Sequence, residues 1–189
     1  MAEDKRWSEL EASGFRCTQC GNMHRGVFDL APDAPDLWQG GMKRSANAAF
    51  LDGPPGASLC SDDFCVIEGD RYFIRCVLPV PLIGAGDRTF SFGVWCLVFD
   101  DDFERYRSTF DDGNQSHLGP FKARIGNRLK PFNAMNARCI LRLKDGRNRP
   151  DVEVTEADHP LQVAQSAGLD FDALMAIYDA NGHGPSASG

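Results

Sequence analysis

The 189-residue chain has the composition of an ordinary globular protein, with 42% hydrophobic and 25% charged residues. A chain of this length suits one domain, which buries about 70% of the surface that the unfolded chain exposes. The net charge of −7 disfavours a phosphate backbone as the main partner, so we predict no nucleic-acid binding. The longest apolar run, 94–99, is far shorter than the roughly 20 residues that cross a bilayer, so we predict no membrane association.

The start of the chain bears on the cellular compartment. Its first ten residues, M-A-E-D-K-R-W-S-E-L, mix acidic and basic side chains and offer no apolar stretch for a secretion system. We therefore expect a cytoplasmic protein. In that reducing compartment the seven cysteines should be free thiols or metal ligands, because disulfide frameworks belong to oxidising compartments.

The first predicted elements are a short helical turn and a metal-binding motif. The turn lies around Trp7 and should pack beside the motif C-T-Q-C-G-N-M-H that follows. Cys17 and Cys20 are separated by two residues, so both can chelate one ion from a single turn of chain. Gly21 lets backbone N–H groups fold back toward the sulfurs. Residues 15–24, here called the knuckle, therefore predict half of a zinc site.

The next segment, residues 30–59, is rich in proline and glycine, which argues against a long helix or strand. A helical turn over 43–50 is the regular element that we expect there. Long connections inside a compact domain are uncommon and usually have a role. We therefore expect this segment to cover a site or to line a pocket.

The central part of the chain predicts a hairpin. Residues 65–67 and 72–78 are mostly apolar, and the turn cluster 68–70 lies between them. Pro79 and Pro81 should end the second strand, because proline has no N–H group for a ladder hydrogen bond.

A longer strand over 89–99 leads directly into a helix. The second half of the strand is continuously apolar, which suits a position in the middle of a sheet. Asp100–Asp102 then supply a cap and negative charge for a helix whose aromatic residues between Phe103 and Phe110 share one face. The polar stretch 115–133, which contains glycine and proline, carries no element that we can assign.

The last part of the chain predicts a second hairpin and two helices. Residues 136–143 alternate in polarity and should pair with 152–154. One helix is expected from Pro160 to Gly168, capped by Asp158 or His159, and another over 171–178. Residues 183–189 form a small-residue tail that should be disordered.

Strands joined by hairpins, with helices at intervals, predict an α+β fold. We expect a single domain over residues 1–182, built as a mainly antiparallel sheet with flanking helices and the N-terminal Cys-x2-Cys knuckle. The strict alternation of strands and helices that a doubly wound sheet requires is absent from the pattern.

Zinc prefers four ligands in a tetrahedron, so the pair Cys17 and Cys20 must recruit two further groups. His24 is the nearest, and two cysteines beside the sequence D-D, Cys60 and Cys65, follow it. His159 lies at the predicted start of a helix and is a further candidate. We predict a zinc site formed by Cys17, Cys20, His24 and Cys65, with His159 and Cys60 as alternatives for the third and fourth ligands.

Five motifs together resemble a family of uncharacterised bacterial proteins, the domain of unknown function family 2199. They are F-R-C-T-Q-C-G-N-M-H at 15–24, S-D-D-F-C-V-I at 61–67, Y-F-I-R at 72–75, G-V-W at 93–95 and D-H-P-L at 158–161. The resemblance runs from about Phe15 to Tyr178. It implies no activity, because the family itself has none assigned.

The resemblance also bears on the choice of ligands. The residues that match the family pattern are Cys17, Cys20, His24, Asp63, Cys65 and His159. Cys60 has no counterpart, and the resemblance therefore favours Cys65 as the fourth ligand. The chain departs from the pattern at Cys76, where a glycine is expected, and over 113–132.

The sequence is compatible with three functions. We favour a non-enzymatic binding or interaction protein whose zinc site fixes the N-terminal loop against the sheet, and whose partner is an unidentified protein or small molecule. The first alternative is a metal-dependent hydrolase with three protein ligands, a metal-bound water, and Glu68 or Asp63 as the base. The second is a thiol oxidoreductase in which Cys17 and Cys20 form a reversible disulfide.

Overall fold

The computed structural model describes residues 4–39 and 45–185, which form an α+β fold as predicted. The helices are α1 (Lys5–Ala12), α2 (Asn47–Leu51), α3 (Asp100–Thr109), α4 (Pro160–Ala167) and α5 (Phe171–Ala180), with a 3-10 turn over Ser116–Leu118. The strands are β1 (Phe15–Arg16), β2 (Met23–His24), β3 (Leu59–Cys60), β4 (Phe64–Ile67), β5 (Arg71–Pro81), β6 (Thr89–Val98), β7 (Phe121–Ile125), β8 (Arg138–Arg142) and β9 (Asp151–Val154). Within this described part of the chain, no helix has the length and apolar character needed to cross a membrane.

The main sheet is mostly antiparallel and closes on itself. Its strand order is β3-β4-β5-β6-β7-β8-β9, and each of these neighbours pairs in antiparallel fashion. A further parallel contact joins Val77 of β5 to Asp151 of β9, so that β5 to β9 form a closed ring. β1 and β2 form a separate small sheet in the knuckle.

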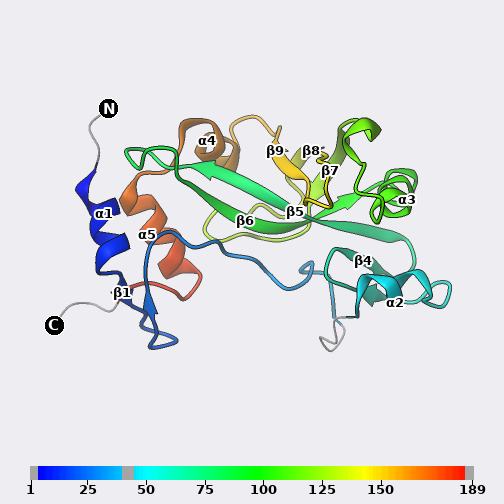
Figure 1. Cartoon of the computed structure of the whole chain (residues 1–189), viewed down its shortest axis with the longest axis horizontal. Helices are drawn as coiled ribbons and strands as arrows, with labels where there is room; N and C mark the ends of the chain where they lie inside the picture. The colour runs from blue at the N-terminus through cyan, green and yellow to red at the C-terminus, as the bar shows by residue number, and fades with distance from the viewer. Residues whose placement is uncertain (1–3, 40–44, 186–189) are drawn as a thin grey trace.

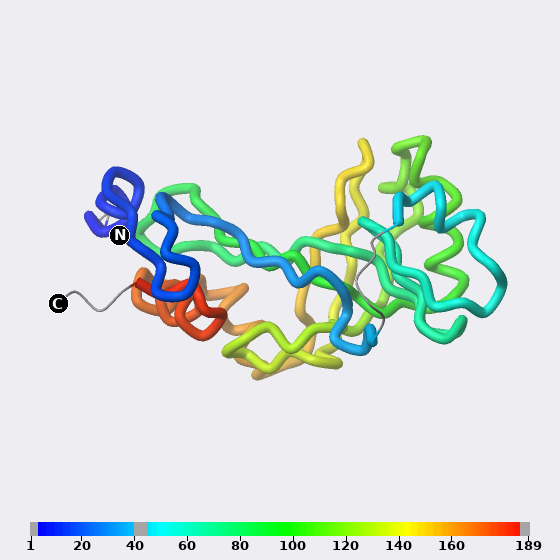
Figure 2. The backbone as a smooth tube through the Cα atoms, turned by 90° about the horizontal axis from the view of Figure 1, so that it is seen from below, coloured from blue at the N-terminus to red at the C-terminus, as the bar shows by residue number. Residues whose placement is uncertain are grey.

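The β5–β6 ladder determines the long dimension of the molecule. Its register runs from Tyr72 opposite Val98 to Pro81 opposite Thr89. Figures 1 and 2 show that these two strands connect two ends of an elongated molecule. One end contains the knuckle, α1 and α5, and the other contains α2, α3 and β4.

The two faces of β5 contribute to two hydrophobic clusters. Ile74, Cys76 and Leu78 point into the main core, which also takes side chains from α3, α4 and α5. Phe73 points to the other face and joins Trp95 in a smaller cluster with three residues of β3 and β4. This alternation follows from the two-residue period of a strand.

The predicted hairpin between β4 and β5 is confirmed, but its second strand does not end at the prolines. Glu68 and Gly69 both have positive φ, as a tight hairpin turn requires. β5 continues through Pro79 and Pro81, which lie opposite Ser91 and Thr89 of β6, because the backbone N and O positions of both prolines lie on the strand edge that β6 does not occupy. Their carbonyl oxygens accept hydrogen bonds from Gln165 and from the N–H of Leu169 instead, so no ladder N–H is missing.

One strand lies in the stretch that the sequence left unassigned. β7 has the burial pattern of a half-exposed strand, with Phe121, Ala123 and Ile125 buried and the two residues between them exposed. The alternation F-K-A-R-I is a strand signal, although it is short and lies between glycines. The helical turn expected over 43–50 is only partly testable, because residues 43 and 44 lie outside the described residues; α2 begins at Asn47.

The segment 27–38, here called the strap, runs along the sheet between the knuckle and the smaller cluster (Figure 2). Leu30 forms a parallel bridge to Phe92, and its carbonyl accepts a hydrogen bond from the N–H of Gly93 at 2.8 Å. A Cβ atom at Gly93 would lie 2.7 Å from the Cβ of Ala31, so glycine is what permits this close approach.

We therefore predict that Gly93→Ala lowers the free energy of unfolding by about 1–3 kcal/mol, because the added methyl group pushes the strap off β6. Urea denaturation of the variant measures the change. The double variant Gly93→Ala with Ala31→Gly removes the colliding methyl group and should recover most of the loss. A single variant as stable as the unmodified protein would contradict this packing.

Candidate metal centre

The knuckle is a short hairpin. Phe15 pairs with His24 and Arg16 with Met23, and a turn connects the two strands. In the turn, the N–H of Gly21 donates to the carbonyl of Cys17 at 3.1 Å. Gly21 has a φ of +68°, which is the left-handed conformation that its position predicts. Local backbone geometry therefore brings the two sulfurs to one side of the turn.

Three of the predicted ligands meet in space, together with a histidine that the sequence analysis did not consider. The ligand atoms of Cys17, Cys20, His24 and His183 all lie within 4.8 Å of one another. Cys20 Sγ is 3.4 Å from His24 Nε2. Ligand atoms around a tetrahedral zinc with ordinary bond lengths are roughly 3.3–3.8 Å apart, so the cluster can close on an ion with small side-chain movements.

His183 reaches the knuckle because the segment after α5 turns back against it. The N–H of His183 donates to Tyr178 O at 2.7 Å, and the N–H of Thr18 donates to Gly184 O at 3.2 Å. Pro185 forms an isolated bridge with Cys17. Residues 183–185, which we expected to belong to a disordered tail, thus pack against the knuckle and α5, and residues 186–189 lie outside the described part.

The surroundings of His183 fit a metal ligand. Its Nδ1 atom is buried and has no hydrogen-bond partner among the described residues. A buried ring nitrogen without a partner carries a desolvation cost, and coordination to an ion removes that cost. Cys2His2 is also one of the ligand sets found in structural zinc sites.

The His24 ring is the first of three stacked rings, and the other two hold it in place. Its imidazole lies on the ring of Phe28, with centroids 4.6 Å apart, and Phe28 lies on Tyr178 at 4.1 Å. The Tyr178 hydroxyl donates to the carbonyl of Phe28 and accepts from its N–H, both at 2.9 Å. The stack thus ties the end of α5 to the chain that leaves the knuckle.

The pKa of the Cys17 thiol in the knuckle is shifted in the opposite direction from that of Cys65. The N–H of Cys20 hydrogen-bonds the Cys17 sulfur and, with a smaller contribution from the N–H of Gln19, lowers the pKa of that thiol despite its desolvation. A lowered pKa favours the thiolate, which is the form that binds metal. In contrast, the contact with the Cys60 thiol, followed by burial, strongly raises the pKa of Cys65.

Cys65, the predicted fourth ligand, is not part of the cluster, so the structure does not bring it together with the other three predicted ligands. It lies on β4, opposite Phe73 and Cys60, and its side chain is fully buried in the smaller cluster. Along β5, the path from Phe73 to Pro81 covers roughly 26 Å, and the knuckle lies at the far end (Figure 1). Cys60, the alternative ligand, lies beside Cys65 and is excluded from the cluster for the same reason.

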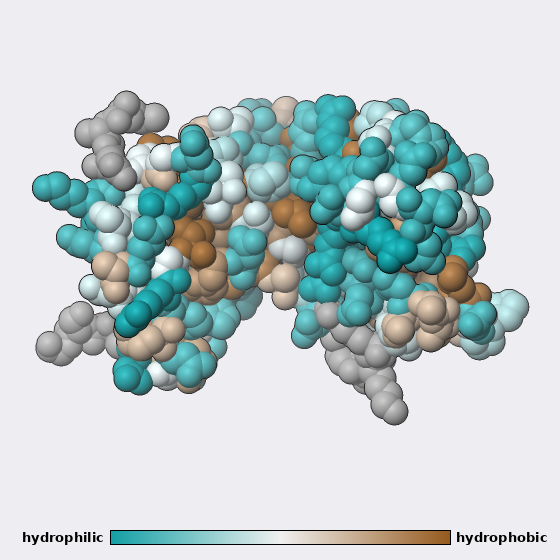
Figure 3. All heavy atoms as spheres, in the orientation of Figure 1, coloured by the Kyte–Doolittle hydropathy of each residue, from teal (hydrophilic) through white to brown (hydrophobic). Residues whose placement is uncertain are grey.

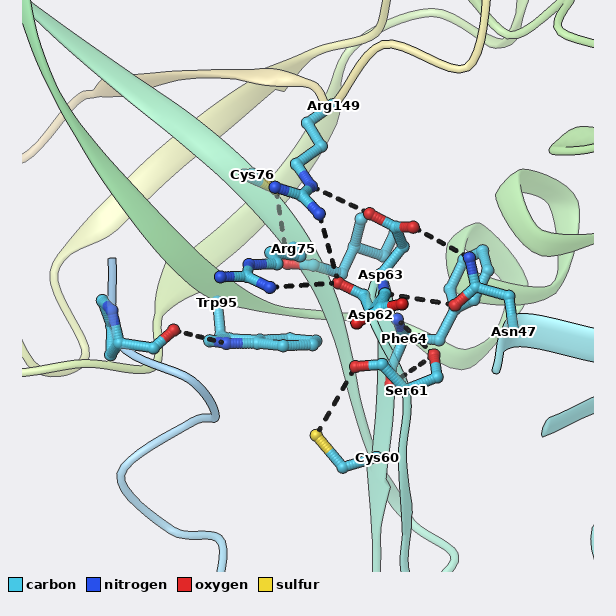
Figure 4. A network of polar contacts seen from close by, with 12 residues as sticks. Asn47, Cys60, Ser61, Asp62, Asp63, Phe64, Arg75, Cys76, Trp95 and Arg149 are labelled. Carbon is cyan, nitrogen blue, oxygen red and sulfur yellow. Dashed lines mark hydrogen bonds and ion pairs between the residues drawn. The ribbon is translucent and has the colours of Figure 1, made fainter. Parts of the chain in front are cut away.

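The other residues that the sequence suggested as ligands or catalytic bases have different interactions in the structure. His159 is the N-cap of α4, where its Nδ1 accepts from the N–H of Leu161 at 3.1 Å. Asp63 accepts hydrogen bonds from Asn47 and Arg149, each at 2.8 Å, in a polar network near β4 (Figure 4). Glu68 is exposed and forms an ion pair with a neighbouring arginine. Neither carboxylate that was considered as a catalytic base lies near the knuckle.

We predict that Tyr178→Phe lowers the free energy of unfolding by about 1–3 kcal/mol, because both backbone groups of Phe28 lose their partner. Urea denaturation measures this. Tyr72→Phe is the matched control, since the Tyr72 hydroxyl makes one hydrogen bond among the described residues, to Gly69 O, and should lose less. Equal losses in the two variants would contradict the supporting role of Tyr178.

Comparisons with known proteins agree with the resemblance seen in the motifs. No curated protein and no solved structure matches the chain. Residues 16–169 match the family described as "Uncharacterized protein conserved in bacteria (DUF2199)". The matched region includes Cys17, Cys20 and His24, whereas His183 lies beyond its end. Because the match covers most of the sequence, the chain belongs to this family of uncharacterised bacterial proteins.

Proposed function

We propose that this chain is a non-enzymatic zinc protein in which one Zn²⁺, held by Cys17, Cys20, His24 and His183, fixes the N-terminal knuckle to the segment after α5. The observation that carries the proposal is the approach of four ligand atoms from both ends of the chain to within 4.8 Å. The lowered pKa of Cys17 and the buried, unpartnered Nδ1 of His183 support it independently.

Zinc is the ion that this ligand set suits best. Thiolate sulfur and imidazole nitrogen are its preferred donors, and structural sites use four protein ligands. Structural zinc contributes an apparent binding free energy of about 10–16 kcal/mol in small peptides, which is enough to order a short segment. The knuckle and residues 182–185 are the segments that such a site would hold together.

The proposed ligand count disfavours the hydrolase that the sequence left open. A catalytic zinc keeps one position for water, whereas four protein ligands fill the tetrahedron. Cys17 and Cys20 also lack the helix N-terminus that activates a redox dithiol, since the turn after them leads into β2. The role that remains is to shape a surface that binds a partner.

The first test is the zinc content of protein purified without chelator and passed over a chelating resin. We expect about one zinc per chain in the unmodified protein and a large loss in Cys17→Ser and in His183→Ala, because each removes one of four ligands. Elemental analysis by mass spectrometry measures this.

Cys65→Ala and His159→Ala serve as controls, since they remove residues that the sequence suggested as ligands and should keep their zinc. Equal zinc in the unmodified protein and in Cys17→Ser would exclude the knuckle as the site. Full retention in His183→Ala would instead remove His183 from the ligand set.

The second test is hydrogen–deuterium exchange before and after metal removal. Chelation should speed exchange at the amide of Thr18, whose acceptor Gly184 O lies across the contact between the knuckle and the segment after α5. It should also speed exchange at the amide of His183, which donates to Tyr178 O and holds the returning segment against α5. Amides of the β5–β6 ladder should keep their protection. His183→Ala without chelator should reproduce this local effect. Faster exchange throughout the sheet would show that the ion stabilises the whole fold and not only the contact between the knuckle and the segment after α5.

A further inference from the structure

A cleft with a volume of about 360 Å³ opens beside the candidate metal centre. Its lining comes from four parts of the chain: the strap, β6, the loop after β7 and the segment after α5. Leu30, Phe92 and Leu129 give it an apolar floor, and His183 lies on its wall. In the view of Figure 3, hydrophobic residues are exposed in the hollowed middle of the molecule.

The walls of this cleft are held in place by internal hydrogen bonds. The Asn127 side-chain amide donates to Ala34 O and to Asp36 Oδ1, both at 2.9 Å, and its oxygen accepts from the N–H of Trp95. On the opposite side, Asn181 Nδ2 donates to Lys130 O at 3.0 Å. A ligand would therefore meet a preformed site and would lose little affinity to ordering the protein.

The rim of the cleft carries two cations, Arg128 and Lys130. Among the described residues of the lining, Asp36 is the one acidic residue, and its two carboxylate oxygens already accept from Asn127 and from the N–H of Arg128. Its ion pair with the Arg128 guanidinium is long, at 4.0 Å, and the Arg128 side chain is 74% exposed. Exposed pairs of this kind contribute little, so the Arg128 guanidinium can turn to an incoming anion. Lys130 is likewise exposed.

We propose that this cleft binds a small organic carboxylate with an apolar body. The carboxylate would pair with Arg128 and Lys130, and the body would cover the floor formed by Leu30, Phe92 and Leu129. The cleft volume admits a molecule the size of an arylalkanoate. The inference rests on the proposed zinc centre in one respect, because the ion would hold His183 and with it one wall.

The test is a titration of the isotope-labelled 189-residue protein, as purified, followed by backbone amide shifts. The probes are 3-phenylpropionate, its neutral amide 3-phenylpropionamide, and inorganic phosphate. We expect 3-phenylpropionate to shift the amides of Ala31, Leu129 and Lys130 with a dissociation constant in the millimolar range or tighter. The neutral amide should bind at least about fivefold more weakly, because it lacks the charge.

Variants then identify the cleft as the site. Arg128→Gln and Lys130→Gln should each weaken 3-phenylpropionate binding by about fivefold or more, whereas Lys122→Gln, which removes an exposed cation of β7 outside the lining, should change it by less than about twofold. Equal binding of the carboxylate and its amide would overturn the proposal. So would equal effects of Lys122→Gln and Lys130→Gln, or phosphate shifting the same amides as strongly as 3-phenylpropionate.

A last comparison separates this proposal from the zinc site. His183→Ala, which removes one wall and one ligand, should weaken 3-phenylpropionate binding while the Lys130→Gln effect persists. If the unmodified protein, as purified, binds 3-phenylpropionate but contains no zinc, the cleft is established and the metal centre is refuted. A zinc-loaded, folded protein that shows no amide shifts would refute the cleft and leave the metal centre intact.

Discussion

The β5–β6 ladder is the interaction on which the rest of the structure depends. It pairs the two longest strands from Tyr72 to Pro81 and fixes the separation of the two ends of the molecule. The smaller hydrophobic cluster forms at one end, and the knuckle packs at the other. Cysteines that lie at opposite ends of this ladder are too far apart to contact one another. Cys65 and Cys17 are separated for this reason, although both belong to motifs that resemble one family.

Much of the fold could be predicted from local pattern. The two hairpins, the strand over 89–99 and the helices α4 and α5 all carry strong periodicity and turn chemistry, and the structure contains each of them. β7 was missed because its five residues lie in a polar, glycine-containing stretch. The predicted end of the second strand at Pro79 and Pro81 was wrong. A proline interrupts a strand only where a neighbouring strand needs its N–H group, and the sequence of the strand alone does not show on which side that neighbour lies.

The candidate site also has a part that local sequence predicts and a part that it does not. Cys17, Cys20 and His24 lie within eight residues, so their spacing alone shows that they can share one ion. His183 is separated from them by almost the whole chain and lies among small residues whose composition is typical of disorder. The available clue was that the chain has only four histidines, each a possible ligand. Only the return of the segment after α5 shows which of them approaches the sulfurs.

Pro79 and Pro81 also affect how copies of this protein behave toward one another. β4 covers the first part of the outer edge of β5, and β9 touches it at Val77. Beyond that point no further strand pairs with this edge within the described residues, and an uncovered edge is a template for intermolecular strand addition and aggregation. A second chain would find two prolines there, with no N–H to offer, and carbonyls already engaged by Gln165 and Leu169. The longest strand is thereby shielded from self-association.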